Sequence, residues 1–224
     1  MDASAIKKKA MFLFPAGLVA VIIMFFLPAG TLDYWQAWVY IAVVCIPASF
    51  VVLYFLKTDP EFLERRMRMK EKETRQRMVI TLSTIIFIIS FLIPGLDRRF
   101  GWSNVPFDFV IAADVFVFLG YLLVILVFKE NSYAGRTIEV DKGQKVISTG
   151  PYSIIRHPMY LGVMVMYLAT PFALGSYVAI PLFLTILPIL VFRIRNEEEV
   201  LRRDLPGYKE YCEKTRYRLL PFIW

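Results

Sequence analysis

Four long apolar blocks constrain the fold of this chain more than any other feature of its sequence. They occupy residues 11–30, 34–56, 79–96 and 107–128. At about 1.5 Å of rise per residue, each block is long enough to cross roughly 30 Å of hydrocarbon as a helix. Of the 224 residues, 58% are apolar but 20% are charged, so the apolar residues are segregated along the chain. This segregation excludes a disordered chain and argues against an ordinary soluble domain.

A fifth apolar region, residues 158–192, is too long for one crossing and contains Pro171, Gly175, Pro181 and Pro188. The break near residues 174–176 predicts two helices that form a tight hairpin in the membrane. The first block follows three lysines, as a secretory signal peptide would, but it is longer than the usual apolar part of such a peptide. We therefore expect a retained first helix and an all-α integral membrane protein with about four transmembrane helices and a C-terminal helix hairpin.

The basic residues predict the orientation of the chain in the membrane. Of the 26 Lys and Arg residues, all except Arg98 and Arg99 fall before the first block, in the loop 57–78, in the segment 129–156 or after residue 192. The positive-inside rule then places both termini and both long polar segments in the cytoplasm. The net charge of +7 is accordingly a topology signal, and its division among juxtamembrane segments argues against nucleic-acid binding. The loop 57–78 mixes charges of both signs with apolar residues, which favours a helix at the lipid headgroups over a catalytic role.

The rare residues limit the possible chemistry. His157 is the only histidine, and Cys45 and Cys212 are the only cysteines, so neither a zinc site nor a disulfide framework is expected. Asp114 falls inside the fourth apolar block, where an ionised carboxylate is costly and normally has a partner or a function. The sequence names no partner for it.

Two pairs of polar residues flank the predicted hairpin. Pro158 marks the start of a helix, which puts His157 near the N-cap, with free N–H groups that favour a carboxylate or a phosphate. Tyr160 lies one turn further along that helix. After the hairpin, Arg193 and Glu197 lie one helical turn apart and share a face. Taken singly, these residues also fit plain roles as a helix cap and as anchors at the membrane interface.

The order and spacing of several short motifs make the C-terminal part of the chain recognisable. The motifs are Gly150-Pro-Tyr152, Arg156-His157-Pro158-x-Tyr160-x-Gly162, Glu197-Glu198 and Pro206-Gly207-x3-Tyr211. Over residues 129–224 this set resembles the isoprenylcysteine carboxyl methyltransferase family and the wider group of membrane phospholipid methyltransferases. The resemblance divides the chain into N-terminal transmembrane helices, 1–128, and a C-terminal catalytic region, 129–224, with a small cytoplasmic cofactor-binding subdomain.

The resemblance implies a methyltransferase that uses S-adenosyl-L-methionine and no metal. It implies catalytic roles for Arg193, Glu197 and His157, with Arg193 contacting the substrate. The implied cofactor-binding residues are Gln144, Lys145, Val146, Ile147, Tyr152, His157, Pro158, Met159, Tyr160 and Glu197, with Glu198 as an alternative to Glu197. Direct displacement of a methyl group requires positioning and desolvation more than an acid–base pair. The substrate would be lipid-borne or amphipathic, and its acceptor group, a carboxylate, an amine or a thiol, stays open.

Two other classes compete with this interpretation. An NADPH-dependent membrane sterol-type reductase has a similar stretch to residues 156–160, although such reductases are usually larger proteins with more helices. A non-enzymatic lipid-binding membrane protein could use the same charged residues for lipid headgroups. That second alternative leaves the clustering of residues 156–160 and 193–197 without an explanation.

Overall fold

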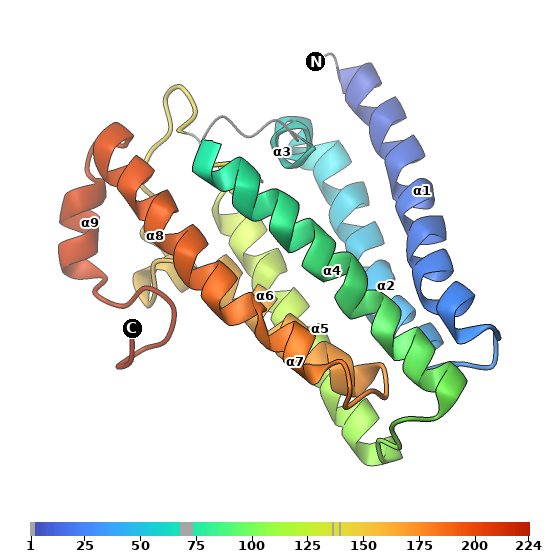
Figure 1. Ribbon diagram of the computed structural model, residues 1–224. Coiled ribbons are helices and arrows are strands. Elements are labelled where there is room, and N and C mark those ends of the chain that lie inside the picture. Colours follow the sequence, from blue (N-terminus) through green and yellow to red (C-terminus); the bar gives the residue numbers. More distant parts are fainter. Residues whose placement is uncertain (1–2, 68–73, 136, 139) are drawn as a thin grey trace.

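The computed structural model describes residues 3–67, 74–135, 137–138 and 140–224, with the side chains of residues 3–5 and 74–80 left out. Within these residues every regular element is a helix (Figure 1), which confirms the all-α prediction.

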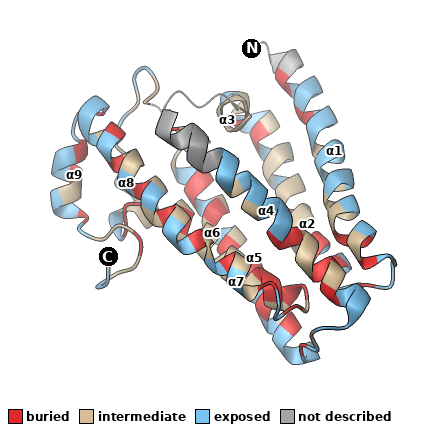
Figure 2. Cartoon of the chain, viewed as in Figure 1, coloured by how far each residue is buried: buried red, intermediate tan, exposed pale blue. Residues whose placement is uncertain are grey.

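Four helices are long and apolar enough to cross a membrane, as the sequence predicts. They are α1 (Ala3–Ala29), α2 (Trp35–Thr58), α4 (Thr74–Phe100) and α5 (Phe107–Glu130). Each extends beyond its apolar block at one end or both, by eight residues at the start of α1 and by two at the ends of α2 and α5. Their outward faces carry many exposed apolar side chains (Figure 2), such as Phe12 and Leu27, as expected for a surface that contacts lipid.

The long helices pack closely where glycine removes a side chain. A Cβ atom on Gly95 of α4 would lie 2.7 Å from the carbonyl oxygen of Phe25 in α1. A Cβ atom on Gly120 of α5 would lie 2.7 Å from the carbonyl oxygen of Gly162, in the helix α6 (Pro158–Ala173), and the reverse contact has the same length. Such close approach of backbones is how membrane helices associate in the absence of a hydrophobic driving force between them.

The fifth apolar region turns back on itself near Gly175, whose φ is +70°, so the predicted break is confirmed. The returning arm is not one helix, however, because a short helix α7 (Ile180–Leu184) precedes the longer helix α8 (Ile186–Asp204). Two prolines account for the division. Pro181 lies in the first turn of α7 and Pro188 in the first turn of α8, where a missing N–H costs least.

The links between α1 and α2, between α4 and α5, and between α6 and α7 gather at one end of the bundle (Figure 1). There Arg98 donates two hydrogen bonds to the carbonyl oxygen of Asp33, at 3.0 and 2.9 Å. The Asp97 carboxylate accepts hydrogen bonds from the Ser103 hydroxyl at 2.6 Å and the Ser176 hydroxyl at 2.5 Å. These contacts join the three links and leave the opposite end of the bundle to the longer polar segments.

The opposite end carries α3 (Pro60–Arg66), the short 3₁₀ helix η1 (Gly150–Ser153) and α9 (Tyr208–Lys214). The helix α3 belongs to the loop 57–78 that the sequence predicts at the headgroups, and its Phe62 and Leu63 are buried among protein side chains. Residues 68–73 of that loop lie outside the described part of the chain.

Asp114 on α5 is 4% exposed, and its two carboxylate oxygens have no hydrogen-bond partner among the described residues. Nearby, Tyr40 of α2 and Thr170 of α6 share a hydrogen bond of 3.0 Å. The structure therefore supplies no partner for Asp114 in the part that it describes, and the cost expected for an ionised carboxylate at this position is not offset there.

Candidate functional site

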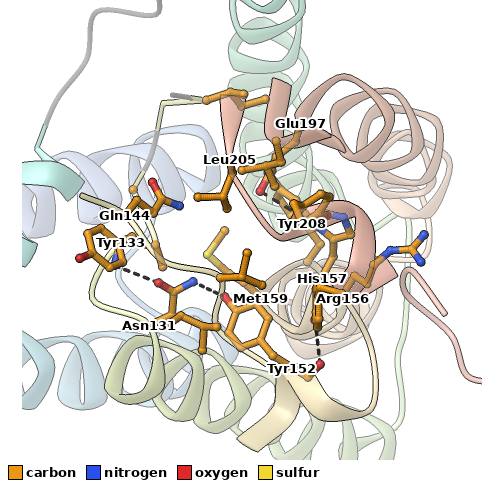
Figure 3. Close-up of a pocket in the computed structure, with 18 of the residues that line it drawn as sticks. Asn131, Tyr133, Gln144, Tyr152, Arg156, His157, Met159, Glu197, Leu205 and Tyr208 are labelled. Atoms are coloured by element: carbon orange, nitrogen blue, oxygen red, sulfur yellow. Dashed lines mark hydrogen bonds and ion pairs between the residues drawn. The ribbon is translucent and has the colours of Figure 1, made fainter. Parts of the chain in front are cut away.

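A pocket lies at the polar end of the bundle, between the segment that follows α5, the start of α6 and the helices α8 and α9 (Figure 3). Its open space, including the mouth, is about 840 Å³. Most of the predicted site residues line it: Gln144, Lys145, Val146, Ile147, Tyr152, His157, Met159, Tyr160, Arg193 and Glu197. Pro158 and Glu198 are not among the lining residues.

The start of α6 forms one wall of the pocket. His157 is the N-cap residue and Pro158 the first residue of the helix, but the His157 side chain makes no capping hydrogen bond. The backbone N–H groups of Arg156 and His157 instead donate to the carbonyl oxygens of Tyr217 and Arg218, both at 2.9 Å. The C-terminal tail is therefore hydrogen-bonded directly to the two residues that precede α6.

His157 lies between two neighbouring carboxylates of α8. Its buried ring places Nδ1 4.0 Å from Oε1 of Glu197 and Nε2 3.4 Å from Oε1 of Glu198. These two carboxylates have different surroundings, because successive residues of a helix point about 100° apart. Glu197 faces the pocket with its side chain 25% exposed, whereas the Glu198 side chain is 4% exposed.

Tyr160 connects the two arms of the hairpin inside the pocket. Its hydroxyl accepts a hydrogen bond from Nε of Arg193 at 2.8 Å and donates one to Oε2 of Glu197 at 2.5 Å. Arg193 and Glu197 come from consecutive turns of α8, as predicted, and α6 supplies the group between them. The pocket thus presents a guanidinium and a carboxylate at fixed positions on either side of one phenol.

Glu198 belongs to a buried ion-pair cluster behind this wall. Its carboxylate accepts hydrogen bonds from Arg156 at 2.7 Å and Arg218 at 2.9 Å, in addition to the His157 contact. Burial alone would raise the pKa of Glu198, but the hydrogen bonds from His157 and Arg218 and the charge of Arg156 lower it to about 2. Glu198 is therefore ionised and occupied by protein partners, which leaves Glu197 as the carboxylate available to a ligand.

Arg156 extends the cluster to the end of α9. Its Nη1 donates to the carbonyl oxygens of Thr215 at 2.9 Å and Arg216 at 3.0 Å, while its side chain also lines the pocket. These hydrogen bonds connect the residue that precedes His157 with the turn that follows α9, and the Arg156 side chain that donates them is only 4% exposed. No role in the site was predicted for Arg156 from the sequence.

Aromatic and amide side chains complete the pocket. The Asn131 amide donates from Nδ2 to the Tyr152 hydroxyl at 2.9 Å and accepts from the backbone N–H of Tyr133 at 2.9 Å (Figure 3). The Tyr211 hydroxyl donates to the carbonyl oxygen of Tyr152 at 2.7 Å. Burial raises the pKa of Tyr152 and the hydrogen bond from Asn131 lowers it by less, so that the resulting pKa is about 12. The phenol is therefore neutral at physiological pH. The Tyr208 hydroxyl is buried without an oxygen or nitrogen partner among the described residues.

Several lining residues were missed by the sequence reasoning. They are Asn131, Tyr133, Ala134, Gly135, Thr137, Ile138, Arg156, Leu201, Leu205, Tyr208 and Tyr211. The i,i+3 spacing of Tyr208 and Tyr211 signals a shared helix face, and Asn131 directly follows an apolar span. Neither signal indicates that Asn131, Tyr208 and Tyr211 line the same pocket. In the described residues, no group of three or more His, Cys, Asp or Glu side chains could hold a metal ion.

The segment that supplies most of the pocket lining matches a known protein family. Residues 109–205 match the family model of the phospholipid methyltransferases, so the family resemblance found in the sequence is confirmed for this segment. The matched segment begins within α5 and includes both arms of the hairpin and most of the pocket lining.

Two curated relatives have different descriptions. A Delta(14)-sterol reductase of Mus musculus is 32% identical over 105 residues, which are 43% of this chain and 25% of that protein. The cobalt-zinc-cadmium resistance protein CzcN of Cupriavidus metallidurans is 26% identical over 146 residues, which are 63% of this chain and 62% of that protein. The chain therefore spans less than two thirds of the length of either relative.

Among solved structures, the chain is similar to the eukaryotic intramembrane Ras methyltransferase, an isoprenylcysteine carboxyl methyltransferase. The sequence identity is 14% and the TM-score is 0.47, with 100% of this chain and 88% of that chain covered.

Proposed function

We propose that this chain is an integral-membrane methyltransferase that uses S-adenosyl-L-methionine and acts on a lipid-borne or amphipathic substrate at the cytoplasmic face of the membrane. The observation that carries the proposal is the match of residues 109–205 to the phospholipid methyltransferases, because that segment contains the Tyr160–Arg193–Glu197 arrangement. The asymmetry of the basic residues supports the cytoplasmic placement, since the pocket is lined from the polar segments and Arg98 contacts Asp33 in the short link at the other end of the bundle.

The residues present suit this cofactor. It combines an amino acid of both charges, a sulfonium and an adenosine, and the pocket offers Lys145 for a carboxylate and Glu197 for a cation. Tyr133, Tyr152 and other lining aromatics supply flat apolar surface for a base.

The bound cofactor would supply an activated methyl group for in-line transfer to a nucleophile of the substrate. The residues of the chain would then contribute positioning and exclusion of water. Tyr160 holds Arg193 and Glu197 apart at fixed positions, so that Glu197 faces the cofactor and Arg193 remains near the membrane side for a polar group of the substrate. His157 forms the wall beside Glu197, with its Nδ1 4.0 Å from Oε1 of that carboxylate. A substrate anchored in lipid would reach this site along the outer surface of the hairpin.

Substitution of Glu197 tests the cofactor assignment. Glu197→Gln removes the negative charge from the pocket while keeping the shape of the side chain, so we expect weaker binding of S-adenosyl-L-methionine, by about tenfold or more. Isothermal titration calorimetry of the protein in detergent measures this directly. Glu199→Gln is the matched control, because Glu199 is an adjacent, exposed carboxylate outside the pocket lining. Equal affinity of the Glu197 variant and the wild type would contradict the assignment.

The methyl acceptor can be identified with a radiolabelled methyl donor. The purified protein is incubated with separate lipid and protein fractions from native membranes, and the labelled fraction names the substrate class. Label in neither fraction, together with no binding of the donor, would contradict the methyltransferase proposal.

A reductase remains the second candidate, because a Delta(14)-sterol reductase is 32% identical over 105 residues. The same pocket would then hold a reduced nicotinamide nucleotide. Titration with NADPH separates the two candidates: saturable binding of NADPH and none of S-adenosyl-L-methionine would favour the reductase.

A further inference from the structure

We propose that α3 is a positioning element of the pocket, and that Arg65 and Arg66 hold the pocket wall formed by residues 131–135 in place. Neither the family match nor the sequence motifs assign a role to α3, which lies outside residues 109–205. The part of the inference that concerns cofactor affinity rests on the proposed function, whereas the part that concerns the order of the wall does not.

The wall segment is bound to α3 through its backbone carbonyl groups. Nε of Arg65 donates to the carbonyl oxygen of Ser132 at 2.9 Å. Nη1 of Arg66 donates to the carbonyl oxygen of Gly135 at 3.0 Å and, at 3.5 Å, to that of Ala134. Hydrogen bonds from a charged donor are stronger than those between neutral groups. Two guanidinium groups therefore donate hydrogen bonds to three carbonyl oxygens within the four consecutive residues 132–135.

The same guanidinium groups also contact side chains next to the pocket. Arg66 lies over the Phe128 ring, 4.8 Å from its centroid, and its Nη1 is 3.8 Å from the sulfur of Met159. Arg65 lies 5.7 Å from the centroid of the Tyr133 ring. Tyr133 and Met159 both line the pocket, so displacement of either arginine alters its wall directly.

The helix α3 is itself held rigidly, which a positioning element requires. Asp59 caps its start by accepting a hydrogen bond from the backbone N–H of Phe62 at 2.9 Å, and Pro60 occupies the first turn. The Phe62 side chain is fully buried, with its ring centroid 4.3 Å from that of Phe55 and 5.1 Å from that of Phe128. The ends of α2 and α5 thus fix α3, and α3 fixes the segment that continues from α5.

This arrangement gives the N-terminal part of the chain a share in ligand binding. The carbonyl groups of residues 132, 134 and 135 lie in an irregular segment, outside the hydrogen-bonding pattern of any helix. If the arginine hydrogen bonds are lost, the segment gains conformational freedom that a ligand must remove again on binding. The expected consequence is weaker ligand affinity with little change in the rate of the chemical step.

The test uses the full chain in detergent and the substitution Arg66→Gln. Hydrogen–deuterium exchange at the amides of residues 133–135 should become about tenfold faster, the size expected for the loss of a hydrogen bond to a charged group. The dissociation constant for S-adenosyl-L-methionine should rise by a similar factor, and kcat for methyl transfer should change less than about twofold. Arg66→Lys, which keeps the charge but loses the planar two-carbonyl geometry, should be intermediate in both measurements.

Lys57→Gln is the matched control, because Lys57 is an exposed basic residue at the end of α2 and should leave both measurements unchanged. Unchanged exchange at residues 133–135 in the Arg66→Gln variant would overturn the inference. Faster exchange with unchanged cofactor affinity would also overturn the role in binding. If the wild type does not bind S-adenosyl-L-methionine, the proposed function fails, and the exchange measurement alone decides whether α3 orders the wall.

Discussion

Glu198 should contribute to stability rather than to ligand binding, and Glu198→Gln tests this. Its carboxylate is the counter-ion of Arg156, whose side chain is 4% exposed, and of the half-buried Arg218. Replacement by the neutral amide leaves Arg156, Arg218 and Arg202 without their shared counter-ion, with His157 beside it. The neutral variant keeps the volume of the side chain, so the effect reports on charge rather than on packing.

The size of the effect follows from the pKa of this carboxyl group. A decrease from the ordinary value of 4.5 to about 2 corresponds to about 3 kcal/mol of stabilisation when the group is ionised. Removal of one partner from a buried ion pair typically costs about 3–5 kcal/mol, which agrees with this figure. For a chain of this length, a loss of about 3 kcal/mol lowers the melting temperature by roughly 6–12 °C.

The assay is thermal unfolding of the wild type and the variant in detergent, at neutral pH and at about pH 3. Because the pKa of Glu198 is lower in the folded than in the unfolded protein, its contribution is present above pH 4.5 and is lost as the pH falls toward about 2. The difference in melting temperature between wild type and Glu198→Gln should therefore shrink at about pH 3. Glu199 is an exposed neighbour of Glu198, so the control variant Glu199→Gln should have the same melting temperature as the wild type at both pH values.

Two results would refute this reasoning. One is a Glu198→Gln variant that melts within about 1 °C of the wild type at neutral pH, which would show that the cluster makes no net contribution. The other is a difference that stays constant between neutral pH and about pH 3, which would show that the effect does not arise from the charge of Glu198.

Three further predictions concern other parts of the molecule. Tyr160→Phe removes the hydroxyl between Arg193 and Glu197, so turnover in the methyl-transfer assay should fall at least tenfold while the melting temperature changes by only a few degrees; unchanged turnover would contradict the bridging role. Asp114→Asn removes a buried carboxylate without a described partner, so thermal unfolding should show a melting temperature equal to or above that of the wild type, and a large decrease would reveal a partner. Gly120→Ala places a Cβ atom 2.7 Å from the carbonyl oxygen of Gly162, so unfolding in denaturant should show a loss of about 1–3 kcal/mol; an unchanged midpoint would contradict the close crossing of α5 and α6.

The membrane-spanning part of the fold was predictable from the sequence because its requirement is local. A span needs about 20 consecutive apolar residues, and this condition is met or failed within one block. The bounds of α2 and α5 lie within two residues of the predicted blocks for the same reason. Pro181 and Pro188 also act locally and account for the division of the returning arm into α7 and α8, although we predicted that arm as one helix.

The candidate site was predictable only where its residues form compact motifs. The motif around His157 and the i,i+4 pair of Arg193 and Glu197 are visible along the chain, and both reach the pocket. Asn131 and Tyr208 belong to no such motif around the site, because each reaches the pocket through contacts with residues that are distant in sequence. The contact of α3 with residues 132–135 joins segments 67 to 69 residues apart, so no local pattern could have revealed it.

The sequence by itself determined that this chain crosses the membrane, where the crossings lie, and which residue types are concentrated at one end of the bundle. The tertiary structure alone decided what each of those residues faces. Glu197 and Glu198 show the difference most clearly, since adjacent carboxylates of one helix are chemically alike in the sequence. A step of about 100° around α8 turns one toward the pocket and the other toward Arg156 and Arg218, and the packing of α6 and the C-terminal tail against α8 sets which is which.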